Sequence, residues 1–274
     1  MHFAEAQLAT AEGLWFEVHP ENYMGVGGPR LAGLLAVAER HPVSLHGVGL
    51  SLGGPDLPDA AHLSRFRALI DRLNPARQSE HLAWNRFQGH SVPDLLPLVR
   101  TSAALKQIAD NIDAAQSALG RTLLIENPSH YLPINGHDWS ETDFLRELVV
   151  RTECGLLVDV HNVYVSAQNL AGTDQAFEPV AYLADLPHAA IGEVHLAGGT
   201  EDYEAGLLID SHDAPVPDSV WALYRALLTH AGPVPTLIEW DDQLPQFVGL
   251  MAVRDQAQAC LEAVSAPREM ERVL

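Results

Sequence analysis

The chain has 274 residues, of which 47% are hydrophobic and 19% charged, a composition typical of a packed globular protein rather than a disordered or fibrous one. Asp and Glu outnumber Lys and Arg by 36 to 16, and the formal net charge of −20 disfavours nucleic acid and anionic lipid as partners. Two cysteines are too few for a disulfide framework, and the N-terminus resembles no signal peptide, so we expect a cytoplasmic protein without a membrane span.

Short apolar runs alternate with helical segments along the chain, a pattern typical of a parallel sheet covered by helices. A first helix is expected at residues 3–10. Strands are expected at 14–18, 43–46, 78–82, 122–126, 156–160, 191–196 and 236–240, and helices at 31–39, 61–73, 94–119, 141–151, 180–185, 219–229 and 245–264. Because no linker or shift in composition divides the chain, we expect residues 1–274 to form a single barrel domain.

Seven strands are one fewer than a closed barrel of the triosephosphate isomerase type contains. The predicted fold is therefore an α/β protein, a TIM-type (β/α)8 barrel that either lacks its first strand or is open at that seam. The segments 47–59 and 198–218 have no clear periodicity and follow strands. Barrel enzymes keep their functional loops at these positions.

Most of the predicted strands end in a side chain that can bind a metal ion. The candidates, with two more from the IDSHD segment, are His46, His81, Glu126, Asp159, His161, Asn162, His195, Asp210, His212 and Glu239. In a parallel barrel all strands open at the same face, so these residues should converge. Imidazole and carboxylate donors without thiolates suit Fe, Mn, Zn or Co, and ten candidates exceed the needs of one ion. Bridging carboxylates such as Glu126 or Asp159 would let adjacent ions share charge.

Each of these residues taken alone has a simpler interpretation. A single histidine at a strand end is more often a hydrogen-bonded structural residue than a ligand. Together, however, so many buried polar groups would be unstable without something to bind them. Glu80 lies beside His81, and Glu21 and Asn22 suit either a substrate contact or a loop cap. The histidines in helices or loops are expected to be solvated, with a reservation for His130 because it lies close to Glu126 in the sequence; they are His41, His62, His90, His130, His137 and His188. We expect Cys154 to be a core residue.

The segments FEVHPENYM, LHGVGLSLG, SEHLAW, IENPSHY, VDVHNVYVSAQN, EVHLAG, LIDSHD and LIEWD occur in this order over nearly the whole chain. Together they resemble the multinuclear non-haem iron oxidative enzymes, the family that includes the iron enzyme of methanobactin biosynthesis. The resemblance implies a TIM-type barrel with two or three Fe ions, and the ten candidate residues match the iron-binding positions of the family. Relatives usually begin with a glycine-rich first strand, and this chain starts after it.

The resemblance also implies an activity and partners. Such enzymes use dioxygen as co-substrate to modify cysteine, or sometimes another residue, in a ribosomally made precursor peptide, and a small partner protein helps to present that peptide. Glu126, Asp159 and His195 are the residues we expect to serve the reaction directly. Two alternatives stay open: a divalent-metal sugar isomerase or AP-endonuclease-like enzyme on a similar barrel, and a non-catalytic, metal-stabilised peptide-binding module.

Overall fold

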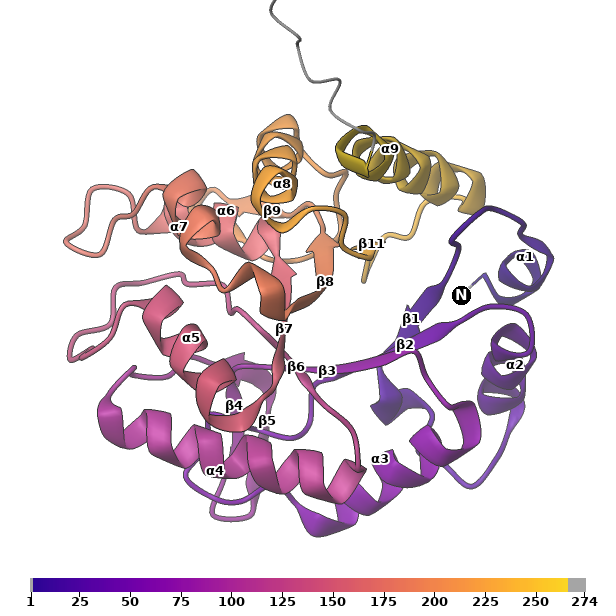
Figure 1. The fold of residues 1–274 in the computed structure, drawn as a ribbon, viewed down its shortest axis with the longest axis horizontal. Coiled ribbons are helices and arrows are strands. Elements are labelled where there is room, and N and C mark those ends of the chain that lie inside the picture. The colour runs from indigo at the N-terminus through magenta and orange to yellow at the C-terminus, as the bar shows by residue number, and fades with distance from the viewer. Residues whose placement is uncertain (1, 266–274) are drawn as a thin grey trace, which may run out of the picture.

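The computed structural model describes residues 2–265, in which seven parallel strands form one sheet that curves into a nearly closed barrel (Figure 1). The strands, in their order across the sheet, are β1 (Phe16–Val18), β2 (Val43–Gly47), β3 (Arg77–His81), β6 (Leu124–Glu126), β7 (Gly155–Asp159), β8 (Ile191–Leu196) and β11 (Thr236–Ile238). Strands that are adjacent in the sheet also follow one another along the chain, apart from the short hairpins inserted between them. The predicted barrel fold and all seven predicted strands are confirmed.

Helices cover the outside of the sheet (Figure 1). They are α1 (Phe3–Leu8), α2 (Pro29–Ala38), α3 (Ala60–Leu73), α4 (Ser102–Leu119), α5 (Glu141–Thr152), α6 (Val160–Asn169), α7 (Pro179–Asp185), α8 (Asp218–Ala231) and α9 (Phe247–Ser265). The side chains of Asp59, Thr101 and Ser140 accept hydrogen bonds from backbone N–H groups in the first turns of α3, α4 and α5. These caps fix where the helices start. Within residues 2–265, no helix is long and apolar enough to cross a bilayer.

The core lies between the sheet and the helices. Phe66 of α3, Leu105 of α4 and Phe144 of α5 are fully buried against outward-facing residues of the strands. The inside of the barrel is different, because its inward-facing residues include buried serines, glutamates and histidines. This polar interior is what brings the candidate residues together.

Three sequence predictions need correction. The helix predicted at 94–119 begins at Ser102, because residues 84–96 form a hairpin of β4 (Trp84–Phe87) and β5 (His90–Leu96). Gln88 and Gly89, with φ of 48° and 79°, make its turn. The fifth predicted strand ends at Asp159, which caps α6. The segment 198–218 contains a second hairpin, β9 (Thr200–Asp202) and β10 (Leu207–Ile209).

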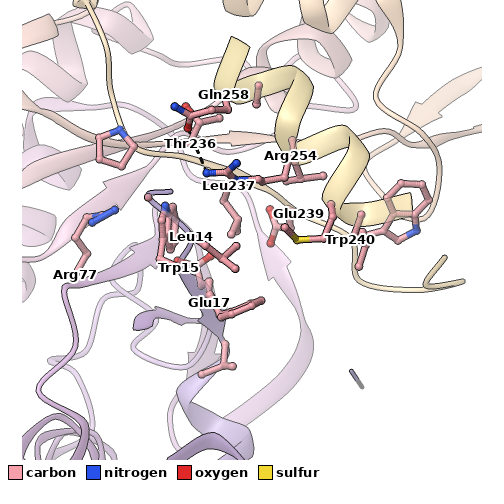
Figure 2. A pocket seen from close by; sticks show the side chains of 18 of the residues that line it. Leu14, Trp15, Glu17, Arg77, Thr236, Leu237, Glu239, Trp240, Arg254 and Gln258 are labelled. Carbon is pink, nitrogen blue, oxygen red and sulfur yellow. Dashed lines mark hydrogen bonds between the residues drawn. The ribbon is translucent and has the colours of Figure 1, made fainter. Parts of the chain in front are cut away.

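The barrel is open between β1 and β11, which form the two edges of the sheet. A cleft of about 480 Å³ separates the edges, and α9 covers its outer side with Leu250, Met251 and Arg254. Figure 2 shows Glu17 of β1 and Glu239, just beyond β11, among the residues that line this cleft. The strand count left an open seam and a missing first strand as alternatives, and among the described residues the seam between β1 and β11 is open.

Candidate metal centre

All ten predicted residues lie at the mouth of the barrel. They form overlapping groups, in which each residue is within a few ångströms of at least one other. Eight of them are buried, and His81 and Asp210 keep partial exposure, with 19% and 13% of the side chain accessible. Their positions follow from register: Asp159 of β7 is level with His195 of β8, and Glu126 of β6 with His81 of β3. Residues level in adjacent strands point to the same face of the sheet, here the barrel interior.

The first group consists of His46, His81 and Glu126. The Nε2 atoms of the two histidines lie 3.3 Å apart, and Glu126 Oε2 lies 3.1 Å from His46 Nε2 and 3.2 Å from His81 Nε2. Each ring is held by its other nitrogen: His81 Nδ1 bonds the carbonyl of Gly47 at 2.9 Å, and His46 Nδ1 bonds Ser79 Oγ at 2.7 Å. Since a carbonyl can only accept, His81 carries its proton on Nδ1 and presents a free lone pair at Nε2.

The second group consists of Asp159, Asp210, His161, His212 and Glu239. His212 contacts four carboxylates. Its Nε2 lies 2.7 Å from Asp210 Oδ1 and 3.6 Å from Asp159 Oδ2, and its Nδ1 lies 3.2 Å from Glu239 Oε2 and 3.6 Å from Asp241 Oδ2. His161 Nδ1 lies 2.8 Å from the same oxygen of Asp210. Asp159 and His161 come from the start of α6, while Asp210 and His212 follow β10.

Asp159 and Asn162 are held by a small network next to this group. Asp159 accepts a hydrogen bond from the Asn162 N–H at 2.8 Å, and Asn127 bonds both the N–H and the carbonyl of Asp159. Asn162 Nδ2 lies 3.4 Å from Glu126 Oε1. The abrupt change from strand β7 to helix α6 thus places Asp159, His161 and Asn162 on the rim together.

Several oxygen and nitrogen atoms of the site that could bind a metal ion are buried without a hydrogen-bond partner among the described residues. They are Glu126 Oε2, Asp159 Oδ2, Asn162 Oδ1, His195 Nε2 and His212 Nε2. Leaving a buried polar atom unsatisfied costs roughly 1–3 kcal/mol. Their convergence fits metal ions bound between them, and a set of imidazole nitrogens with carboxylate and amide oxygens fits Fe, Mn, Co or Zn.

The pKa values at the site reflect an excess of buried carboxylates. Burial raises the pKa of Glu126 and of Asp159 to about 7, although nearby histidines lower both. Burial alone would lower the pKa of His212, but Glu239 and Asp210 outweigh it and raise that pKa well above the ordinary value. Bound cations would balance the same negative charge without protons.

An open cleft of about 850 Å³ leads from the site to the surface. His81, Glu126 and Asp210 line its inner end, while Val92 and Leu95 of β5 and the loop that follows β6 form its walls. Among the described residues that line it, none is Lys or Arg.

Sequence reasoning missed two residues beside the site: Glu17, whose side chain is 6% exposed, and Glu193, which is fully buried. The signal was available, since FEVH and GEVH repeat the same spacing, with a glutamate two residues before a histidine and hence on the same face of the strand. It also missed Asp241, which lies 3.7 Å from His19 Nε2. Burial opposes the charge on His19, but the contact with Asp241 helps to raise its pKa to about 9.

Other sequence predictions have mixed outcomes. Glu21 accepts a hydrogen bond from the Val48 N–H and lies 3.3 Å from His62 Nε2, so it supports the loop after β2. His62 and His130 were expected to be solvated and are not, because each is largely covered and paired with a glutamate, His130 with Glu141. Cys154 is buried as predicted, and burial raises the pKa of its thiol to about 11.

The fold and site define the class of (β/α) barrel enzymes whose strand ends can hold metal ions. The chain belongs to the family described as "RiPP precursor modification enzyme MbnB/TglH/ChrH", whose model matches residues 1–262. RiPPs are ribosomally made, post-translationally modified peptides, so the match confirms the resemblance found in the sequence.

The chain is also similar to curated relatives and to solved structures. A UPF0276 protein of Caulobacter vibrioides (strain NA1000 / CB15N) is 55% identical over 99% of this chain and 96% of its own. One of Rhizobium meliloti (strain 1021) is 48% identical over 94% and 83%. Endonuclease IV from Thermus thermophilus has a TM-score of 0.60 at 18% identity, covering 95% of this chain and 94% of its own. D-psicose 3-epimerase from Clostridium cellulolyticum H10 has a TM-score of 0.55 at 10% identity, covering 96% and 91%. At such identities the two structures share the fold alone.

Proposed function

We propose that this protein is a multinuclear non-haem iron enzyme that uses dioxygen to oxidise a residue, cysteine foremost, in a ribosomally synthesised precursor peptide. The observation that carries the proposal is the convergence of ten imidazole, carboxylate and amide groups at one barrel mouth, several with buried donor atoms that lack a partner among the described residues. Membership of the family supplies the peptide substrate class.

In this proposal the two groups of side chains hold two or three Fe ions (Fe2+ or Fe3+). His46 and His81 would bind one ion through Nε2, and His161, Asp210 and His212 would bind another. Glu126 of the first group and Asp159 of the second could bridge ions, as buried carboxylates do in multinuclear sites. Bound iron would supply the redox chemistry with dioxygen, while the protein holds the ligand side chains in place.

The cleft above the site is the proposed path of the peptide. Its inner end reaches His81, Glu126 and Asp210, so a side chain of an extended peptide could approach the centre while the backbone stays between the walls. A cysteine thiolate is a good ligand for iron and could occupy an open position. We expect a small partner protein to help present the peptide, as the resemblance implies.

The two alternatives differ from this proposal in measurable ways. A sugar isomerase or AP-endonuclease-like enzyme would work with zinc or manganese and without dioxygen. A non-catalytic module would bind peptide and metal but would not consume dioxygen. The acidic surface disfavours a DNA substrate.

The test begins with metal analysis of protein purified without air. We expect two to three irons per chain after loading with ferrous salt. Coexpression with a neighbouring small open reading frame that encodes a cysteine-containing peptide should then give a mass change that requires dioxygen. Full activity with zinc or manganese in air-free buffer would refute the iron proposal, and a loaded protein that never consumes dioxygen with the peptide would favour the binding module.

A further inference from the structure

His195 presents its two ring nitrogens to carboxylates on opposite sides. Nδ1 bonds Glu239 Oε2 at 2.8 Å, whereas Nε2 lies 3.0 Å from Glu17 Oε1 and 3.5 Å from Glu193 Oε1. The ring is fully buried. A histidine that binds a metal normally uses one nitrogen for it and donates the N–H of the other to a carboxylate or carbonyl. The surroundings of the two nitrogens therefore decide which one faces the metal.

The strand register separates the two sides. His195 is level with Leu237, so Glu239 lies two residues closer to the C-terminal mouth. Glu193 lies two residues closer to the opposite end of β8. Nδ1 thus faces the mouth, where Glu239 also contacts His212 at 3.2 Å. Nε2 faces the layer beneath.

The charges of the two sides differ as well. In the lower layer, Glu193 Oε2 is paired with Arg77 Nε at 3.1 Å and accepts a hydrogen bond from Ser44 at 3.3 Å. At the mouth, the ion-pair contacts of Glu126, Asp159, Asp210 and Glu239 within residues 2–265 are all with histidines. Glu17, Glu193 and His195 also lie close enough together to hold an ion, but part of their charge is already offset by Arg77. The carboxylates of the mouth have histidines alone as ion-pair partners within residues 2–265, so a bound cation offsets more unpaired charge there.

We infer that Glu17 is the positioning residue of His195: its carboxylate holds the proton on Nε2, which leaves Nδ1 free to bind a metal ion at the mouth. Glu17, whose side chain is 6% exposed, comes from β1 on one edge of the seam and lines the same cleft as Glu239 at the other edge (Figure 2). His195 Nε2 is within ion-pair distance of Glu17 but not aligned for a hydrogen bond, and Glu17 Oε2 has no partner in the described part of the chain. A metal ion at Nδ1 would displace the proton that Nδ1 shares with Glu239. The ring would then carry its proton on Nε2, next to Glu17.

The inference rests on the proposed metal centre but not on iron or on the reaction. Its test compares Glu17→Ala and Glu17→Gln with the exposed Glu147→Gln as the control. Metal affinity is measured by titrating each full-length protein with Co2+ against a chelator. We expect Glu17→Ala to bind at least one ion 10- to 100-fold more weakly, as for other residues that orient a ligand, while Glu17→Gln recovers part of the loss because its amide oxygen can accept.

A second readout is the protonation and metal coordination of the His195 ring. In 15N-labelled, zinc-loaded wild-type protein, NMR should show His195 protonated at Nε2 and coordinated through Nδ1, its signals being assigned with His195→Gln. Wild-type protein that binds no transition metal would refute the proposed centre. Wild-type protein that binds metal while Glu17→Ala binds equally well, or a ring coordinated through Nε2, would overturn this inference alone. The NMR readout needs no variant at Glu17, so the test stands even if Glu17→Ala does not fold.

Discussion

Gly199 passes so close to His161 that a Cβ atom on residue 199 would lie 2.8 Å from His161 Cε1, and it would also collide with the Ile209 carbonyl oxygen. Glycine is therefore required here because the backbone after β8 packs directly on the imidazole. We predict that Gly199→Ala displaces His161 and the strand that leads to Asp210, so that the protein binds fewer metal ions. Elemental analysis after loading with ferrous salt measures the change.

The control for Gly199 is Gly27→Ala, because nothing lies within 4 Å of a Cβ at Gly27. This variant should bind as much metal as the wild type. Equal metal content in both variants would mean that His161 is not required for binding.

Substitution of Glu126 and Asp159, the carboxylates proposed to bridge ions, should remove bound metal most completely. Glu126→Gln and Asp159→Asn keep the size of the side chain but remove the charge that lies against His46, His81 and His212. We expect each variant to lose at least one ion, and the double variant to lose nearly all. The measurement is metal content after gel filtration, with Glu147→Gln as control, and an unchanged content in Asp159→Asn would contradict the bridging role.

Glu141 should make stability depend on pH. Burial would raise its pKa, but His130 and Arg100 outweigh burial and lower that pKa to about 2. A lowered carboxyl pKa stabilises the fold above the unfolded value of 4.5, and this contribution is lost as pH falls towards 2. We predict that Glu141→Gln lowers the free energy of unfolding at pH 7 by roughly 2–4 kcal/mol. Urea unfolding from pH 7 to pH 3 should show the difference shrinking below pH 4.5, and a constant difference would disprove this origin.

Asn111 ties α4 to the loop that follows β2. Its buried amide donates hydrogen bonds to the carbonyls of Leu52 at 2.9 Å and Gly54 at 3.0 Å. Asn111→Ala would leave both carbonyls without these donors, at a cost of roughly 1–3 kcal/mol for each. The exposed neighbour Asp110→Ala is the matched control. Urea denaturation that gave the same midpoint for both variants would contradict the role of Asn111.

The sequence predicted the barrel and the metal-competent residues for one physical reason. Parallel strands buried on both faces read as apolar runs, so the polar residue that ends each run stands out, as at Glu126 and His195. Barrel topology then requires these ends to meet. The hairpin at residues 84–96 was missed because its proline and exposed residues carry no strong alternation and the following helix extended the pattern. The pairing of His130 with Glu141 was missed because it depends on how a loop folds back onto α5.

By itself, then, the sequence determined the seven strands and the ten residues of the mouth, since these follow from periodicity and from the rule that parallel strands end together. Only the tertiary structure decided which donor atoms meet. The contacts of His212 with Asp210 and Glu239, and of Glu17 with His195, join segments far apart in the chain. Their distances depend on strand register and side-chain packing, which local sequence patterns do not encode.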